Sequence, residues 1–193
     1  KALLNAGLIK IVTIAPELPG AIELIQYLVA NNIVVSLGHT NANREEAIAG
    51  FNAGAKTVTH LFNAMPKPPL DGTAQVAIER ADVTIQIIID EVHVPNDLVK
   101  ETLAKVANRF IVTNDPIAAA GLGSGTYPFG GMEITVKDGQ ARRTDGTLAG
   151  GIGTLERALE IMDSIGIAKE DALASVTTRP CELIGVDYKS LLN

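Results

Sequence analysis

The three histidines of this chain each follow an apolar run that is typical of a buried β-strand. They are His39, His60 and His93, and the runs are residues 33–37, 57–59 and 83–89. In a parallel α/β sheet or barrel, the carboxyl ends of the strands lie at one rim, where residues distant in sequence come together. We therefore expect the three imidazoles to be neighbours.

Imidazole is the commonest nitrogen ligand of zinc and related divalent ions in proteins. A single histidine near a strand end is more often a hydrogen-bonded structural residue, so the prediction depends on the joint placement of all three. A catalytic metal held by two or three protein ligands keeps a position open for water and lowers the pKa of that water. The pattern predicts metal-activated hydrolysis by a divalent ion, zinc first, with iron, cobalt or manganese as alternatives.

Composition favours one soluble globular domain. The chain has 193 residues, of which 47% are apolar and 20% charged, and its formal net charge is −6. Basic residues are scattered, which argues against nucleic acid or an anionic membrane as a partner. No apolar run approaches the roughly 20 residues of a membrane span, and the first residues lack the layout of a signal peptide. The single Cys181 fits a reducing compartment, so we expect a cytoplasmic protein.

Strands and helices alternate along most of the chain. Strands are predicted at residues 9–15, 33–37, 57–59, 83–89 and 110–113, and helices at 21–31, 43–53, 73–80, 96–107, 154–164 and 169–177, with residues 1–7 as the end of a helix. The strands begin 24 to 27 residues apart, the step of a βα barrel, and an eight-unit barrel needs roughly 250 residues. We therefore expect residues 1–193 to be the later part of a TIM-type (β/α)8 barrel, with the N-terminal strands missing.

The alternation changes near Tyr127, where apolar residues begin to recur at every second position. Two predicted strands, residues 132–136 and 140–144, flank the dipeptide Asp138-Gly139, and a second Asp-Gly follows at position 145. Asp-Gly between alternating segments is a strong β-hairpin signal. We expect a β-hairpin insertion over about residues 127–146.

Five motifs, in order, resemble those of N-acetylglucosamine-6-phosphate deacetylase, a family of the amidohydrolase superfamily. They are Gly38-His39-Thr-Asn-Ala with Ala53-Gly54, Thr59-His60-Leu-Phe-Asn63-Ala64-Met65, Asp90-Glu-Val-His93, Asp115-Pro-Ile-Ala-Ala-Ala-Gly121 and Asp145-Gly-Thr-Leu-Ala-Gly150. The resemblance covers nearly the whole chain but only the C-terminal half to two-thirds of the family's length. It implies a metal-dependent barrel enzyme that releases acetate from an amino-sugar phosphate, and a homodimer in the full-length protein.

The resemblance also implies roles for individual residues. His39 and His60 match the family's two metal-binding histidines, and His93 matches a histidine that contacts the substrate. Asn63 and Ala64 match its phosphate and sugar contact. The residues that match the loop closing over the acetyl end are Leu148, Ala149 and Gly150.

A carboxylate must take the proton of the attacking water and return it to the leaving amine. The family's Val-Thr-Asp reads Val-Thr-Asn114-Asp115 here, so either residue can be aligned with the catalytic aspartate. Because asparagine cannot act as a base, we favour Asp115.

Two other positions depart from the family pattern. The family's third metal ligand is a glutamate of a Glu-Gly-Pro motif upstream of this sequence, and Glu17 matches a different family position. The family's phosphate-holding arginine has no counterpart in residues 66–72, where Lys67 is a candidate substitute. Two rival hypotheses therefore remain: an amidohydrolase acting on another N-acyl substrate, and a non-catalytic βα-fold fragment or binding module.

Overall fold

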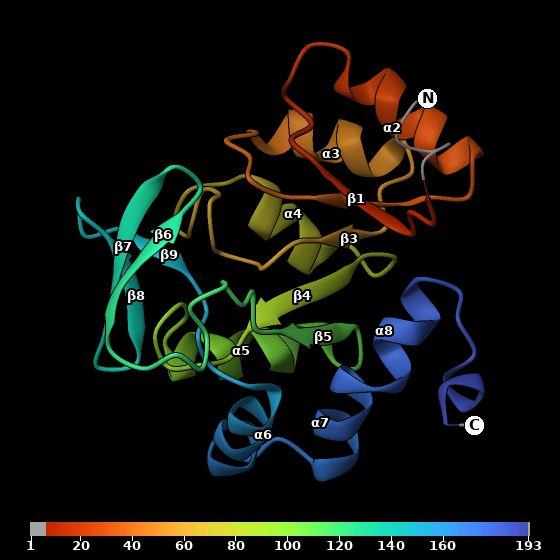
Figure 1. Cartoon of the computed structure of the whole chain (residues 1–193). Coiled ribbons are helices and arrows are strands. Elements are labelled where there is room, and N and C mark those ends of the chain that lie inside the picture. The colour runs from red at the N-terminus through yellow and green to blue at the C-terminus, as the bar shows by residue number, and fades with distance from the viewer. Residues whose placement is uncertain (1–6, 193) are drawn as a thin grey trace.

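Five parallel strands form the central sheet of the computed structural model, which describes residues 7–192 (Figure 1). Their order in the sheet is their order in the chain: β1 (Ile11–Ile14), β2 (Val34–Leu37), β3 (Thr57–Val58), β4 (Thr84–Ile88) and β5 (Phe110–Thr113). Neighbouring strands pair in parallel register throughout. Their carboxyl ends therefore lie along one edge, as the sequence predicts.

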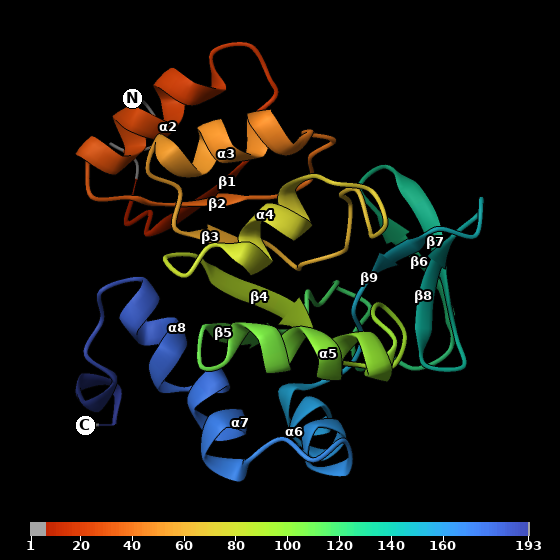
Figure 2. The same ribbon diagram turned by 180° about the vertical axis from the view of Figure 1, so that it is seen from behind.

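Four helices connect the strands and pack side by side on one face of this sheet (Figure 2). They are α2 (Ala21–Ala30), α3 (Arg44–Asn52), α4 (Thr73–Glu79) and α5 (Asn96–Val106). Alternate strand residues such as Val35, Leu37 and Ile85 are fully buried against the helices. The opposite face carries hydroxyls, where Thr59 Oγ1 lies 2.5 Å from Ser36 Oγ and 3.0 Å from Thr13 Oγ1. Each helix returns the chain to the start of the next parallel strand. All five strands therefore run in the same direction and end at the same edge of the sheet.

A four-stranded antiparallel sheet follows β5. Its strands, in order, are β6 (Gly125–Phe129), β7 (Met132–Lys137), β8 (Gln140–Arg143) and β9 (Leu148–Gly150). The sequence predicts only the two central strands. Pro128 weakens the strand signal of β6, and it is accommodated because β6 is an edge strand. A small apolar cluster, which includes Ile134 and Val136, is the core of this sheet.

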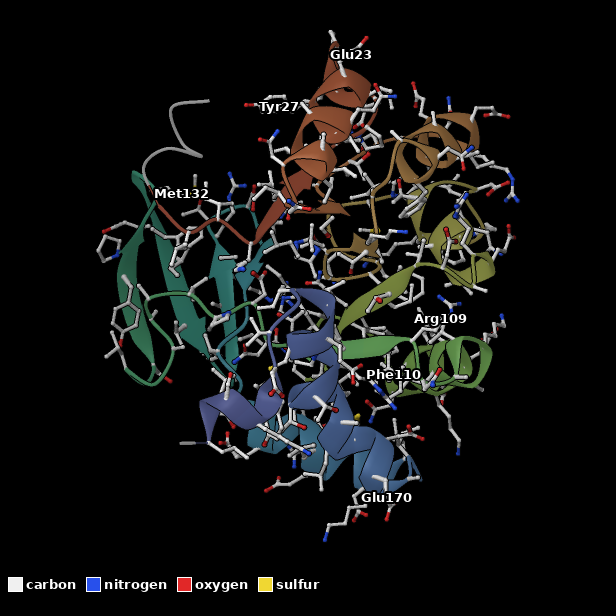
Figure 3. All side chains as sticks on the ribbon, turned by 90° about the vertical axis from the view of Figure 1, so that its right-hand side faces the viewer. Glu23, Tyr27, Arg109, Phe110, Met132 and Glu170 are labelled. Atoms are coloured by element: carbon white, nitrogen blue, oxygen red, sulfur yellow. The ribbon has the colours of Figure 1, made fainter. Side chains whose placement is uncertain are left out.

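Three helices complete the chain on the β5 side: α6 (Leu155–Ser164), α7 (Lys169–Val176) and α8 (Thr178–Leu183), followed by the 3-10 turn η1 (Tyr188–Leu191). Phe110 at the start of β5 lies beside these helices (Figure 3), and the guanidinium of Arg179 lies 4.8 Å from the centre of its ring. The sequence does not predict α8, because Pro180 suggests a stop. Pro180 instead occupies the first turn, where its missing N–H needs no helical partner.

The helices and parallel strands predicted within residues 9–177 are confirmed, each within two residues of its expected bounds. The predicted helix end at residues 1–7 lies outside the described residues, except for Gly7. Within residues 7–192 the five parallel strands form an open sheet, so a closed eight-stranded barrel and the missing N-terminal strands stay predictions. None of the described helices is long and apolar enough to cross a bilayer.

Candidate active site

His39 and His60 meet at the carboxyl edge of the parallel sheet. His39 follows β2 and His60 follows the neighbouring strand β3, so the two backbones lie side by side. Their Nε2 atoms are 2.8 Å apart, and the rings are nearly perpendicular, with centroids 4.6 Å apart. At this distance one Nε2 donates a proton to the other, so in the absence of an ion the pair shares a hydrogen bond. The expected convergence of the two imidazoles is found.

His39, His60, Ala64 and Asp115 are among the residues at this edge with left-handed backbone conformations. The φ angles are 49° for His39, 32° for His60, 49° for Ala64 and 45° for Asp115. Fewer than one in ten residues other than glycine adopt positive φ. His39, His60 and Asp115 each lie two residues after the end of a strand, so this conformation occurs where the chain leaves the sheet.

His60 is buried, with 3% of its surface exposed, whereas the side chain of His39 is exposed. Burial lowers the pKa of His60 and so favours the neutral imidazole, and the negative charge of Asp115 offsets this only in part. Its Nδ1 atom has no hydrogen-bond partner among the described residues. A neutral imidazole keeps a lone pair on one ring nitrogen, and this is the form that can bind a metal ion.

His93 is oriented by Asp90. One carboxylate oxygen of Asp90 lies 2.7 Å from Nδ1 of His93, and the other accepts the amide protons of Val92 and His93 at 2.9 and 2.8 Å. Burial raises the pKa of Asp90, but these hydrogen bonds outweigh it, and the net pKa lies below the usual value. The carboxylate is therefore ionised and accepts the Nδ1 proton, which leaves Nε2 of His93 free for another partner.

These groups line one cavity of about 450 Å³. The nine residues that the sequence analysis proposes for the site all line it: His39, His60, Asn63, Ala64, His93, Asp115, Leu148, Ala149 and Gly150. Three further residues complete its lining: Lys67, Arg142 and Thr147. The structure thus places the nine together, while their individual roles stay predictions.

The structure separates Asp115 from its neighbour Asn114. The side-chain amide of Asn114 donates to the carbonyl of Gly153 at 3.1 Å and is not part of the cavity lining. Asp115 lines the cavity, and its charge acts on His60. Of the two alignments that the sequence allows, the geometry supports the one that assigns Asp115.

Arg142 and Thr147 are the lining residues that the sequence analysis misses. Arg142 lies on β8, and its guanidinium donates to Oε1 of Gln140 and to the carbonyl of Gly146, at 2.9 and 2.6 Å. Sequence alternation predicts that Arg142 and Ala141 face opposite sides of the hairpin. It gives no sign that the hairpin folds over the strand ends.

The imidazole pair fits a metal ion as two of its ligands. Two nitrogens 2.8 Å apart need to separate by only about 0.5 Å to reach the spacing of tetrahedral zinc ligands at 2.0–2.1 Å. Within residues 7–192, no three His, Cys, Asp or Glu side chains are arranged to hold an ion. Metal binding therefore stays a prediction that requires at least one more ligand.

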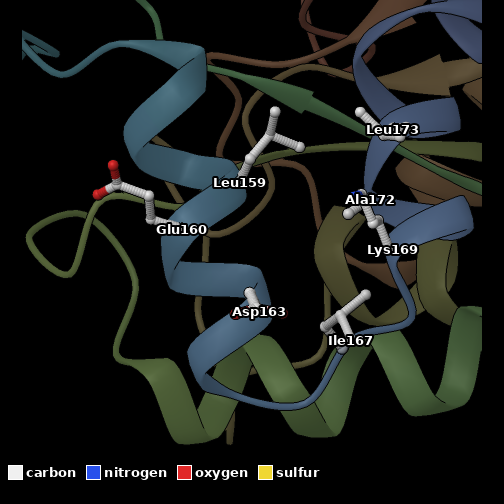
Figure 4. A pocket seen from close by; sticks show the side chains of 7 residues that line it. All are labelled: Leu159, Glu160, Asp163, Ile167, Lys169, Ala172 and Leu173. Atoms are coloured by element: carbon white, nitrogen blue, oxygen red, sulfur yellow. The ribbon is translucent and has the colours of Figure 1, made fainter.

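A second cavity lies between α6 and α7, away from the strand ends (Figure 4). It measures about 360 Å³, and its lining combines Leu159, Ile167 and Leu173 with the charged side chains of Glu160, Asp163 and Lys169. No histidine lines it. The cavity at the strand ends is therefore the candidate active site.

Comparison with known proteins agrees with this geometry, although no family model matches the chain. A Bacillus subtilis (strain 168) N-acetylglucosamine-6-phosphate deacetylase is 35% identical over 178 residues, which cover 89% of this chain and 44% of the relative. A Caenorhabditis elegans protein of the same name is 34% identical over 96% of this chain and 47% of its own length. This chain is homologous to N-acetylglucosamine-6-phosphate deacetylases. It spans about half the length of the curated relatives that it matches.

Solved structures of N-acetylglucosamine-6-phosphate deacetylases have the same fold over the shared region. The Pasteurella multocida enzyme aligns with a TM-score of 0.88 at 30% identity, over 95% of this chain and 49% of that one. A mutant Mycobacterium smegmatis deacetylase in complex with N-acetyl-D-glucosamine-6-phosphate aligns with a TM-score of 0.85 at 33% identity, over 92% and 49%. Sequence and structure thus lead to the same deacetylases.

Proposed function

We propose that this protein is a metal-dependent amide hydrolase that converts N-acetylglucosamine 6-phosphate to glucosamine 6-phosphate and acetate. The observation that carries the proposal is the cavity itself. A pair of imidazoles, a carboxylate and a third histidine from four different strand ends line the same 450 Å³ space. Homology to deacetylases over about half of their length supports the same reaction.

His39 and His60 would hold the divalent metal, zinc first, together with a ligand outside the described residues. When bound, such an ion polarises the amide carbonyl and lowers the pKa of water. The burial that keeps His60 neutral favours this role, because a protonated imidazole cannot be a ligand.

Asp115 would move the protons of the reaction. Its carboxylate takes a proton from the attacking water as the new C–O bond forms. It then gives that proton to the amide nitrogen as the C–N bond breaks, so that acetate and a free amine leave. His93, fixed by Asp90 with Nε2 free, would hydrogen-bond the substrate, and Leu148, Ala149 and Gly150 would close over the acetyl group.

The phosphate end would face Lys67 and Arg142, beside Asn63 and Ala64. Within the described residues neither cation forms an ion pair with a carboxylate, so their charge is not compensated by the protein. Charge-assisted hydrogen bonds to a phosphate are stronger than those to a neutral hydroxyl. These two cations support a phosphorylated sugar in preference to a neutral one.

We further propose that the enzyme acts in the cytoplasm, as a homodimer. A phosphorylated sugar crosses membranes poorly, which supports a cytoplasmic reaction. Sedimentation of the purified full-length protein would test the dimer, and a single species of monomer mass would contradict it.

Release of acetate from N-acetylglucosamine 6-phosphate by the full-length protein is the direct test. We expect activity that is lost on dialysis against a chelator and regained with zinc, iron, cobalt or manganese. An Escherichia coli O157:H7 relative, 29% identical, is named for N-acetylgalactosamine 6-phosphate, which makes that epimer a second candidate substrate. Activity towards the epimer alone would change the substrate assignment. Absence of activity towards both sugars would contradict the proposal.

A further inference from the structure

Glu17, just after β1, binds the loop that carries His39. One carboxylate oxygen accepts the amide proton of Asn41 at 2.7 Å, and the other accepts the hydroxyl proton of Thr40 at 2.5 Å. Glu17 has no role in the site that the sequence predicts, and Glu17 does not line the cavity. We propose that Glu17 is a positioning residue, which fixes the backbone after His39 and thereby aims its imidazole at His60.

Thr40 extends this connection in two directions. Its hydroxyl oxygen accepts the amide proton of Ala42 at 2.9 Å while its proton goes to Glu17. Its own amide donates to the carbonyl of Ala64 at 3.0 Å, beyond His60. Thr40 is 2% exposed, so water does not compete for these bonds. The loops that carry the two histidines are thus joined through the residue next to His39.

His39 needs such an anchor because its own side chain is little constrained. The ring is exposed, and its hydrogen bond to Nε2 of His60 is its one direct side-chain partner among the described residues. Its backbone has φ 49°, a conformation that must be held by neighbours. The direction of the ring therefore depends on where residues 40–42 are held, and Glu17 holds them.

The position requires a carboxylate. Two donors approach two different oxygens of Glu17, and glutamine has only one acceptor oxygen. With glutamine, the amide nitrogen would face the Thr40 hydroxyl, and the charge assistance of both bonds would be lost. Alanine would leave both donors without their partner. We expect graded effects: glutamine weakens the anchor and alanine removes it.

The inference rests on the proposed role of His39 as a metal ligand, and its test uses a readout besides activity. Full-length wild-type protein and the variants Glu17→Ala and Glu17→Gln are titrated with Co²⁺, and the absorption of the bound ion is recorded. Loss of a group that orients a metal ligand typically costs about 10- to 100-fold in affinity. We expect a loss of this size for Glu17→Ala and a smaller one for Glu17→Gln.

The side-chain ¹⁵N signals of His39 and His60 in the metal-free protein give a second readout. They report the Nε2–Nε2 hydrogen bond and are expected to change in Glu17→Ala. Glu45→Gln is the matched control, since Glu45 is an exposed glutamate on the same loop–helix segment whose side chain forms no hydrogen bond or ion pair within residues 7–192. It is expected to match the wild type in both measurements.

Thr40 supplies variants that leave Glu17 intact. Thr40→Val keeps the shape but removes the hydroxyl and should weaken Co²⁺ binding, whereas Thr40→Ser restores the hydroxyl and should rescue it. Wild-type Co²⁺ affinity and unchanged histidine signals in Glu17→Ala would overturn the inference. If Glu17→Ala does not fold, Thr40→Val takes its place, and wild-type Co²⁺ affinity of Thr40→Val would overturn the inference. Wild-type protein that binds no Co²⁺ would refute the proposed metal chemistry instead, and the histidine signals would still test the anchor.

Discussion

The backbone carbonyl of Asp115 accepts a hydrogen bond from the amide of Gly151 at 2.8 Å. Next to it, Pro116 and Gly151 form a parallel bridge, and the amide of Ile117 donates to the carbonyl of Gly151 at 3.1 Å. The end of the parallel sheet is thereby joined to the end of the antiparallel sheet at the residue proposed as the base. The same joint places β9, and with it the residues proposed to cover the acetyl group.

Replacing Gly151 with alanine should disrupt this joint. The added Cβ would lie 1.8 Å from the carbonyl oxygen of Asn114, so the backbone must move. Forcing extra atoms into a packed site typically costs about 1–3 kcal/mol. We expect a fall of that size in the free energy of unfolding and a loss of kcat. Gly153→Ala is the control, because its Cβ would meet only Asp90 Cβ at 3.8 Å. Equal behaviour of the two variants would show that the joint does not matter.

Replacing Asp115 with asparagine should reduce kcat for acetate release by about 10²- to 10⁴-fold, the contribution typical of a general acid–base group. Co²⁺ binding should change little, because the imidazole pair remains. Asn114→Ala is the companion variant, since it loses only the hydrogen bond to Gly153, a cost of about 1 kcal/mol in stability. An inactive Asn114→Ala together with an active Asp115→Asn would reverse the assignment.

Removing a cavity cation should weaken binding of the phosphorylated substrate. For Lys67→Gln and Arg142→Gln we expect KM for N-acetylglucosamine 6-phosphate to rise about tenfold or more, the loss of one hydrogen bond to a charged group. The change in kcat should be smaller, and KM for unphosphorylated N-acetylglucosamine should stay the same. Lys100→Gln, on an exposed position of α5, serves as control. A similar rise in KM for both sugars would mean that these cations do not recognise the phosphate.

Asp90→Asn should destabilise the protein in a pH-dependent way. The folded-state pKa of Asp90 is depressed, so its stabilisation is present above the unfolded pKa of about 3.9 and is lost as the pH falls through the lower folded value. At pH 7 the variant should lose about 1.5–3 kcal/mol, the range for hydrogen bonds to a charged group. Urea unfolding at several pH values measures this difference. It should narrow below about pH 4; a constant difference down to pH 2 would contradict the prediction.

Much of the parallel sheet could be predicted because its signals are local. Apolar runs end at His39 and His60, and Asn43 with Glu46 forms the capping box that begins α3. Convergence of the histidines followed from strand direction alone. The place of the antiparallel sheet in the site could not be predicted, because the position of Arg142 depends on how β6–β9 pack against the ends of the parallel strands. Local pattern gives the strands of a hairpin but does not determine its orientation.

The contacts of Glu17 could not be predicted from the sequence for a different reason. A glutamate in the Ala-Pro-Glu turn after β1 looks like any solvated loop residue, and its partners Thr40 and Asn41 are more than twenty positions away. Hydrogen bonds between loops of adjacent strands leave no periodic trace in a sequence. Such contacts become visible only in three dimensions.

The left-handed backbone at His39, His60, Ala64 and Asp115 implies that this edge trades stability for chemistry. A left-handed conformation costs a residue with a side chain roughly 1–2 kcal/mol, a cost that glycine avoids. At His39, His60 and Asp115 glycine would remove that penalty while eliminating the side chain proposed to act. Selection for thermal resistance would therefore favour glycine at these positions, whereas selection for turnover would favour the present residues. The most heat-resistant variants of the protein with substitutions at this edge should include inactive ones.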